Sequence, residues 1–239
     1  MIPKVKSFET PENVASTFAS RLIELLNHTK EASKIATVCL SGGSTPKLLF
    51  KTLAKDHAGI DWSSVHFFWG DERCVPADSD ESNYGEAARL FLNDANIPAE
   101  NIHAVNTSLD PSSSAIDYQQ QIEAVVAKDS NGVPAFDLMV LGMGDDGHTA
   151  SIFPHQMELL ASEYLCEVAT HPVSGQKRIT MTGQVISASK EICFLVTGAN
   201  KADVLAQILK DQPGCEQYPT RHFSDLPAVT FWVDQATGA

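Results

Sequence analysis

The segment FDLMVLGMGDDGHTASIFP, residues 136–154, contains a strong strand signal that is followed by a close group of titratable and hydroxyl side chains. Its start, residues 136–141, is a mostly apolar run of strand length, which predicts a buried strand. Glycines end the run, and Asp145, Asp146 and His148 follow closely. The segment therefore predicts a strand that delivers titratable groups at its carboxyl end.

The same arrangement recurs along the chain. Apolar runs at residues 35–40, 65–69 and 192–198 each end in polar, often glycine-containing sequence, and helical patterns follow at residues 84–92 and 200–209. Strands that alternate with helices pair in parallel. The predicted fold class is α/β, a mostly parallel sheet with helices on both faces. Since ligands of such sheets gather outside the carboxyl ends of the strands, we expect these ends to share one crevice.

Helix-start and loop signals complete the prediction. Thr10 and Pro11 are typical of an N-cap followed by proline at the first helical position, and a long amphipathic helix is expected after them. The predicted loops are residues 108–114, 128–135 and 210–220. None of these loops has the composition of a clear domain linker.

Charge and composition exclude several classes of function. The chain of 239 residues has a formal net charge of -13, which argues against binding to nucleic acid or to an anionic membrane. No apolar run approaches the roughly 20 residues of a membrane helix, and the first residues lack the apolar core of a signal peptide, so we expect a cytoplasmic protein. The five cysteines include no C-x-x-C pair, and no spacing suggests a metal site.

The glycines of the first segment allow two interpretations. Residues 142–147 match G-x-G-x-x-G, a dinucleotide-binding pattern, after a predicted strand. Two aspartates inside the turn would repel a pyrophosphate, however, and Pro154 leaves little room for the long helix that such a site needs. We favour a turn that brings the acids close to His148, with an ordinary tight turn capped by an aspartate as the alternative.

A second glycine turn has the character of an anion site. A run of five residues lies between a predicted strand and a helix expected from about Pro46: Ser41, Gly42, Gly43, Ser44 and Thr45. Free backbone N–H groups, hydroxyls and the positive end of the helix dipole converge there, which favours phosphate or carboxylate. The G-x-x-x-x-G-K-[ST] spacing is absent. A helix capped by Ser or Thr is the alternative.

Three cations lie close to the predicted strand ends. Arg73 stands beside Asp71, where a surface ion pair is the alternative to a planar fork that binds phosphate. Lys201 falls in the first turn of a predicted helix, where the dipole disfavours a cation, so we interpret it as facing an anion. Arg178 falls in a segment of alternating polar and apolar residues.

His148 is the candidate acid–base residue. Asp146 precedes it by two positions, close enough for a carboxylate to orient the imidazole ring and raise its basicity. The other seven histidines lack such a setting. A structural histidine bonded to the backbone is the alternative.

Taken together, five motifs closely resemble those of the 6-phosphogluconolactonase family. In chain order they are LSGGSTP (residues 40–46), WGDERCVPADSDESN (69–83), LGMGDDGHTASIFP (141–154), RITMT (178–182) and GANKA (198–202). Weaker signals at both ends extend the match to the whole chain. Five ordered motifs at compatible spacing are far more specific than any one of them.

The distantly related glucosamine-6-phosphate deaminases share the glycine turn, GH and GxxKA themes. Where they carry DEY, this chain has DER at residues 71–73, and where they carry GHIAFNEP, it has GHTASIFP at residues 147–154. These differences favour the lactonase.

The resemblance implies one domain over residues 1–239, with the fold of the sugar-phosphate isomerases and deaminases. It implies hydrolysis of 6-phospho-D-glucono-1,5-lactone to 6-phospho-D-gluconate in the oxidative pentose phosphate pathway, without cofactor or metal. The partner would be this small sugar-phosphate lactone, with no nucleic acid and no membrane. The sequence leaves the oligomeric state open, and a monomer is our expectation.

The resemblance also implies roles for the matching residues. His148 would be the general base and would return the proton to the leaving oxygen. Asp146 would orient His148, and Asp71 would hold Arg73 or a sugar hydroxyl. The implied substrate-binding residues are Arg73, Arg178, Lys201 and the turn of Gly42, Gly43, Ser44 and Thr45.

Two other functions stay open at this level. A deaminase or isomerase of an amino sugar phosphate would share the GxGxDGH turn, and ammonia release from glucosamine 6-phosphate would identify it. A non-catalytic sugar-phosphate sensor would use the same pocket, with saturable binding and no turnover.

Overall fold

The computed structural model of the chain describes residues 3–32, 34–56, 60–95 and 97–239. Its strands are β1 (Lys4–Phe8), β2 (Ala36–Leu40), β3 (Val65–Trp69), β4 (Asp71–Arg73), β5 (Leu138–Leu141), β6 (Cys166–Thr170), β7 (Lys177–Met181), β8 (Ile192–Val196) and β9 (Val229–Asp234). Its α-helices are α1 (Pro11–Glu31), α2 (Ser44–Asp56), α3 (Asn83–Ala87), α4 (Pro111–Val125), α5 (Gly183–Ala188), α6 (Ala202–Leu209) and α7 (Pro219–Phe223). Shorter helical turns are η1 (Trp62–Ser64), η2 (Ala88–Leu92), η3 (Ala99–Asn101), η4 (Pro154–Leu160), η5 (Ala199–Lys201), η6 (Cys215–Gln217) and η7 (Gln235–Thr237). In the described part of the chain, no helix is both long and apolar enough to cross a membrane.

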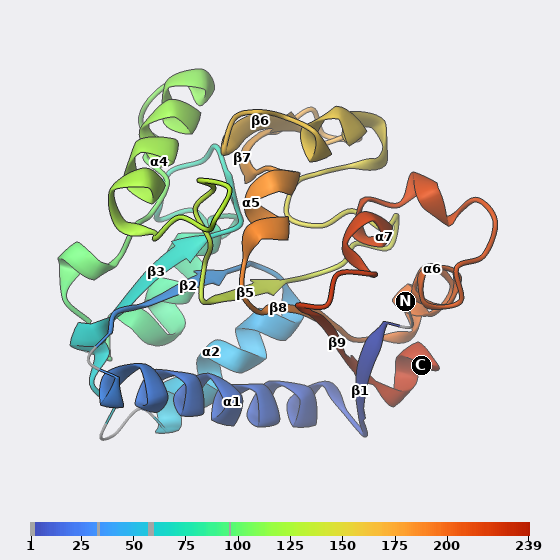
Figure 1. Ribbon diagram of the computed structural model, residues 1–239, viewed down its shortest axis with the longest axis horizontal. Helices are drawn as coiled ribbons and strands as arrows, with labels where there is room; N and C mark the ends of the chain where they lie inside the picture. Colours follow the sequence, from blue (N-terminus) through green and yellow to red (C-terminus); the bar gives the residue numbers. More distant parts are fainter. Residues whose placement is uncertain (1–2, 33, 57–59, 96) are drawn as a thin grey trace.

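The larger sheet has six strands in the order β1-β9-β8-β5-β2-β3 (Figure 1). Its strand pairs are parallel, with Ala36 of β2 opposite Val65 of β3 and Ile192 of β8 opposite Val229 of β9. The predicted parallel sheet is therefore confirmed. The strands β2, β5 and β8 are buried at every residue, as expected of parallel strands that are covered on both faces.

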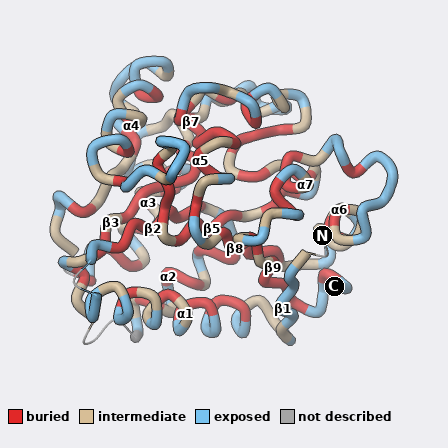
Figure 2. Tube along the Cα trace, viewed as in Figure 1, coloured by how far each residue is buried: buried red, intermediate tan, exposed pale blue. Residues whose placement is uncertain are grey.

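Alternate side chains of these strands enter two separate cores. On one face, Val38 of β2 packs in a cluster with Phe18 of α1 and Phe50 of α2. On the other face, Cys39 of β2 packs in a cluster with Tyr118 of α4 and with residues of α5 and α7. Figure 2 shows these buried segments through the middle of the molecule, between α1 and the small sheet. Helices therefore cover both faces, as predicted.

A second, antiparallel sheet has the order β4-β7-β6 and packs against the second core. The sequence places residues 71–73 at a strand end, whereas the structure pairs them with residues 178–180 as β4 against β7. Gly70 makes the junction between the two sheets: its N–H donates to the Leu40 carbonyl, and its carbonyl accepts from the Met181 N–H, both at 2.8 Å. The chain thus passes from β3 directly into the small sheet and carries Asp71 and Arg73 with it.

The sequence predicts a loop at residues 108–114, but α4 begins inside it. Asp110 is the N-cap and accepts a hydrogen bond from Ser113 N at 3.2 Å, and Pro111 takes the first helical position. This is the signal that correctly predicts α1 after Thr10. The loop prediction is therefore wrong from Pro111 onward, because an aspartate cap and a proline start a helix there.

Other element boundaries differ by a few residues. The helix expected from about Pro46 begins at Ser44. The helix expected at residues 84–92 begins at Asn83 as α3 and continues as the π-helix η2. The loop expected at residues 210–220 contains η6 and the first residues of α7.

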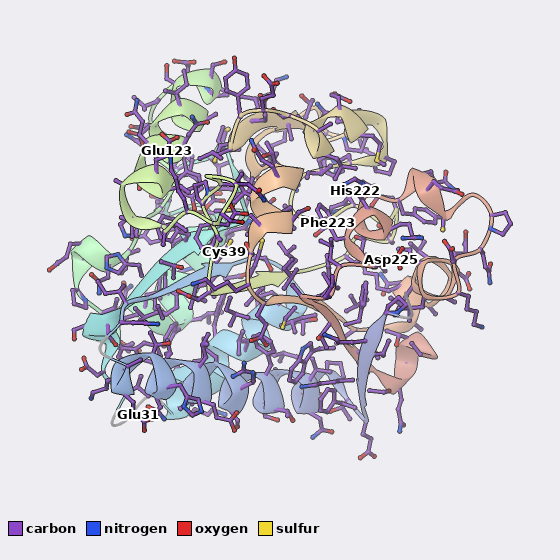
Figure 3. The ribbon with its side chains drawn as sticks, viewed as in Figure 1. Glu31, Cys39, Glu123, His222, Phe223 and Asp225 are labelled. Atoms are coloured by element: carbon purple, nitrogen blue, oxygen red, sulfur yellow. The ribbon has the colours of Figure 1, made fainter. Side chains whose placement is uncertain are left out.

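The cysteines are free thiols, and most of them belong to the cores. Cys39, Cys166, Cys193 and Cys215 are buried, and Cys74 is partly buried. Figure 3 shows Cys39 in the interior of the molecule. Burial raises the pKa of the Cys39 thiol, so this group packs as a neutral side chain.

A histidine pair lies at the edge strand β3. The Nδ1 atom of His66 and the Nε2 atom of His103 are 2.7 Å apart, and the His103 ring stacks on Phe68 with 4.3 Å between centroids. Burial, followed by the charge of His66, lowers the pKa of His103 to about 4. Burial also lowers the pKa of His66.

We predict that this pair makes the fold sensitive to mild acid. An unfolded histidine takes up its proton near pH 6.5, so the unfolded state binds more protons than the folded state below that pH, and the free energy of unfolding falls from about pH 6.5 toward about pH 4. Urea unfolding of His103→Gln should show a shallower fall between about pH 7 and pH 5 than wild type. The variant His28→Gln is the control, since the His28 side chain is 80% exposed. Equal slopes for wild type and His103→Gln would contradict the prediction.

Candidate active site

A cavity of about 290 Å³ lies at the carboxyl ends of β2, β5 and β8, next to β4 and β7. The strand ends that the sequence predicts to share a crevice do come together here. The cavity is lined by Ser41, Gly42, Gly43, Ser44, Thr45, Pro46, Asp71, Arg73, Asn83, Gly142, Met143, Gly144, His148, Ala150, Arg178, Leu195, Val196, Thr197 and Lys201. Of the residues that the sequence predicts for the site, Asp146 alone is outside this lining, and it bonds to His148.

The glycine turn after β5 places His148 at the cavity. Gly144 N donates to the His148 carbonyl at 2.8 Å, and Gly147 N donates to the Gly144 carbonyl at 3.1 Å. Gly147 has a φ of +77°, in the left-handed region that favours glycine. A Cβ atom on Gly144 would lie 2.1 Å from Nδ1 of His148. The turn therefore needs these glycines to bring the imidazole back over the end of its own strand.

Asp146 fixes the orientation of His148. Its Oδ1 atom lies 2.5 Å from Nδ1 of His148 and also accepts the His148 backbone N–H at 3.1 Å. Burial raises the pKa of Asp146, but the hydrogen bonds and the charge of His148 outweigh it and lower the pKa to about 2. An ionised carboxylate only accepts hydrogen bonds, so Nδ1 is the donor and the neutral imidazole keeps Nε2 as its basic atom.

The turn before α2 offers several groups to an anion. Gly43 has a φ of +113°, and a Cβ atom on Gly42 would lie 1.8 Å from Oδ1 of Asn83. The hydroxyl of Ser41 is buried and has no hydrogen-bond partner among the described residues. The hydroxyl of Thr45 is 2.7 Å from that of Thr197, so this turn is tied to the end of β8. The first backbone N–H groups of α2 lack acceptors within the helix and are available to a ligand.

Asp71 lies at the centre of a buried network. It is 6% exposed, and its Oδ2 atom accepts from the Ser151 hydroxyl at 2.6 Å. Its Oδ1 atom accepts from the Asn83 amide at 3.3 Å, and Nη1 of Arg178 lies 3.9 Å from Oδ2. A buried carboxylate needs such partners to remain charged.

Three cations reach the same cavity. Nη1 of Arg73 donates to the Glu81 carbonyl at 2.6 Å, while its buried Nε atom has no partner within the described residues. Arg178 stands directly opposite Arg73 in the pairing of β4 with β7, and burial lowers the pKa of Arg178 while Asp71 opposes the shift. Lys201 is the N-cap residue of α6. Like charges opposite each other on a sheet repel, so this arrangement favours a bound anion.

Two polar residues at the site were not singled out from the sequence: Asn83 lines the cavity, and the Ser151 hydroxyl donates to Asp71. Both lie inside the quoted motifs, but their type alone does not distinguish a capping or surface residue from a partner of a buried carboxylate. Their contacts depend on the junction of the two sheets. The only sequence signal for these two residues is that they lie in motifs that also contain charged residues.

A family model described as glucosamine-6-phosphate isomerases/6-phosphogluconolactonase matches residues 9–232. The chain belongs to this family. A 6-phosphogluconolactonase of Haemophilus influenzae is 43% identical over 235 residues, which cover 96% of each chain. The solved structure of the devB protein superposes with a TM-score of 0.90 at 40% identity, covering 98% of both chains. The structure of 6-phosphogluconolactonase from Trypanosoma cruzi gives a TM-score of 0.88 at 29% identity, covering 99% of this chain and 96% of the other.

Membership of the family extends over nearly the whole chain, and so includes every element that lines the cavity. The matched residues contain the strand ends after β2, β3, β5 and β8 and the small sheet. The resemblance inferred from five motifs is thereby confirmed for the family.

We predict that Gly144→Ala will disturb the His148 turn. The added Cβ would lie 2.1 Å from Nδ1 of His148 and 2.7 Å from Oδ1 of Asp146, so the imidazole must leave its carboxylate or the backbone must move. Overpacking of this kind costs about 1–3 kcal/mol of unfolding free energy. The matched control is Gly142→Ala, where a Cβ meets nothing within 4 Å and the change should stay within about 0.5 kcal/mol. Equal urea midpoints for the two variants would show that Gly144 is not constrained.

Proposed function

We propose that this protein hydrolyses 6-phospho-D-glucono-1,5-lactone to 6-phospho-D-gluconate, the lactonase step of the oxidative pentose phosphate pathway. The observation that carries the proposal is the pairing of His148 with an ionised Asp146 at the wall of a cavity that also contains three cations. The pair of His148 and Asp146 is suited to activate water, and the three cations are suited to bind a phosphate ester. The relatives named 6-phosphogluconolactonase, at 38–43% identity over most of the chain, support the same reaction.

In the proposed mechanism, Nε2 of His148 removes a proton from a water molecule as the oxygen attacks the lactone carbonyl carbon. The carbonyl oxygen becomes negatively charged in the tetrahedral intermediate and is stabilised by donors or cations of the site. The bond to the ring oxygen then breaks, and the imidazolium returns its proton to that oxygen, which becomes a hydroxyl. The product is the open-chain carboxylic acid, which ionises on release. Neither a covalent intermediate nor a cofactor is needed.

Asp146 and Asp71 have different proposed tasks. Asp146 keeps the Nδ1 proton of His148 in place and stabilises the imidazolium that forms during attack. Asp71, with its hydrogen bonds from Ser151 and Asn83 and its ion pair with Arg178, has remaining lone pairs for a sugar hydroxyl. It would therefore orient the lactone rather than attack it.

We propose that the phosphate binds between the turn before α2 and the cations. The turn supplies backbone N–H groups and hydroxyls from Gly42, Gly43, Ser44 and Thr45. Lys201 supplies a positive charge. It lies shortly after Thr197, whose hydroxyl is within hydrogen-bond distance of the Thr45 hydroxyl. Arg73 and Arg178 approach from the small sheet. The turn before α2 and the two arginines are both held by strands of the two sheets. This favours a fixed distance between the phosphate and the carbonyl of the substrate.

We expect His148→Ala to lose about a hundredfold or more of the lactonase rate, since general acid–base catalysis contributes roughly 10²–10⁴-fold. The assay follows loss of freshly made lactone with the spontaneous rate subtracted, and circular dichroism reports folding. His222→Ala, an exposed histidine on α7, is the control and should remain active. A folded His148→Ala enzyme with nearly full activity would disprove the proposed base. Ammonia release from glucosamine 6-phosphate in place of lactone hydrolysis would assign the chain to the other branch of the family.

We expect Lys201→Ala to impair only the phosphorylated substrate. A hydrogen bond to a charged group contributes about 1.5–3 kcal/mol, so kcat/KM for the phospholactone should fall about ten- to a hundredfold. The rate with unphosphorylated D-glucono-1,5-lactone should hardly change. Lys210→Ala is the control, since Lys210 is an exposed residue at the other end of α6. An equal loss with both lactones would place Lys201 at the carbonyl and not at the phosphate.

A further inference from the structure

Phe153 is a buried ring surrounded by titratable and charged side chains. It is 1% exposed, and its ring centroid lies 4.7 Å from that of His148, 5.4 Å from His171 and 5.8 Å from His155. The guanidinium carbon of Arg178 lies over the same ring, 5.7 Å from its centroid. One apolar side chain thus touches the proposed base and one of the proposed substrate-binding cations.

The backbone around Phe153 holds the ring in a defined place. Phe153 precedes Pro154 and is the N-cap residue of η4, and its carbonyl accepts from Gln156 N at 2.9 Å. The preceding Ile152 closes a tight turn with Thr149, whose N–H and carbonyl both bond to it. Phe153 does not belong to the lining of the cavity, so it contacts the proposed catalytic groups from behind.

The contacts of Arg178 show why such support matters. Its guanidinium has only long polar contacts among the described residues: 3.4 Å to Gln176 Oε1, 3.5 Å to the Ser151 hydroxyl and 3.9 Å to Asp71 Oδ2. Contacts of this length orient a guanidinium weakly. The face of Phe153 lies within the range of a cation–π interaction and adds a flat surface that restricts the guanidinium plane.

His148 needs a similar second contact. The hydrogen bond from Nδ1 to Asp146 fixes one ring atom, but a single bond leaves the imidazole free to tilt about it. The Phe153 ring packs against the imidazole at an interplanar angle of 48° and limits that tilt.

We infer that Phe153 is a positioning residue for the hydrolysis: it holds the His148 imidazole and the Arg178 guanidinium in the relative orientation that the reaction needs. The inference rests on the proposed function, because His148 and Arg178 act on the lactone only in that proposal. Because Phe153 does not line the cavity, its proposed effect passes through these two side chains.

The kinetic test compares Phe153→Leu, Phe153→Tyr and Phe91→Leu. Phe91 is an equally buried phenylalanine, 1% exposed, that packs on Trp62 and Phe67 in the other core. Loss of orientation in Phe153→Leu should reduce kcat by about tenfold or more and raise KM about two- to fivefold through Arg178. Phe153→Tyr, which keeps the ring face, should recover most of the activity. Phe91→Leu should lose a similar amount of thermal stability with kcat and KM close to wild type.

Rates are taken per folded molecule, as measured by circular dichroism. A simple loss of folded enzyme lowers the apparent kcat and leaves KM unchanged, so a rise in KM separates positioning from unfolding. Kinetic constants for Phe153→Leu within twofold of wild type would overturn the inference, as would a folded Phe153→Tyr that is as slow as Phe153→Leu.

A spectroscopic measurement tests the inference without relying on lactonase activity. The imidazole proton resonances of His148, assigned by their absence in His148→Ala, should move in Phe153→Leu because the ring current and the ring tilt both change, and they should stay near wild type in Phe91→Leu. Unchanged His148 resonances in Phe153→Leu would overturn the inference even if the enzyme hydrolyses the lactone. Shifted resonances in a protein without lactonase activity would instead overturn the proposed function and leave the contact established. If Phe153→Leu does not fold, Phe153→Met is used in both measurements with the same criteria.

Discussion

The site depends on one constraint: β2, β5 and β8 are parallel strands buried on both faces. Charged side chains cannot be placed within such strands without partners, because each face enters an apolar core. The carboxyl edge of the sheet is different, since the chain there must turn into a helix or loop and its backbone N–H groups are free. Each strand end therefore delivers its polar residues to the same edge, and the cavity is the place where the ends of three parallel strands meet the small sheet.

The charge of the cavity is independent of the charge of the chain. The protein carries a formal net charge of -13, yet Arg73, Arg178 and Lys201 line one small cavity. The small sheet makes this possible, because β4 and β7 place the two arginines opposite each other and leave Asp71 on the same side to compensate Arg178. The overall charge argues against partners with large anionic surfaces. A small anion is recognised by a few groups whose positions are set by strand pairing.

The sequence contained the local parts of this structure and lacked the long-range ones. Apolar runs, the cap at Thr10 and the glycine turns are signals within a few residues, and the parallel sheet follows from their alternation. The pairing of Asp71 with Thr180 in the small sheet joins segments that are far apart in the chain, and three-residue strands such as β4 show no periodicity. The hydroxyl of Ser151 and the ring of Phe153 were quoted within a motif, but their contacts with Asp71 and His148 exist only once both sheets are assembled. The motifs predicted which residues gather at the site, and packing determines which of them support the others.

Several local conflicts lie at this site. Ala150 has a φ of +48°, a left-handed conformation that costs on the order of 1 kcal/mol for a residue with a Cβ. The buried Ser41 hydroxyl and the Arg73 Nε atom lack partners among the described residues, and Arg73 faces Arg178. All four residues line the same cavity. Such features persist only where the surrounding structure imposes them, and the fully buried strands on which these segments are mounted provide that rigidity. An oxyanion or phosphate in the cavity would supply the missing acceptors and relieve the repulsion between the arginines. The unfavourable interactions at this site are therefore the same ones that a bound anion would make favourable.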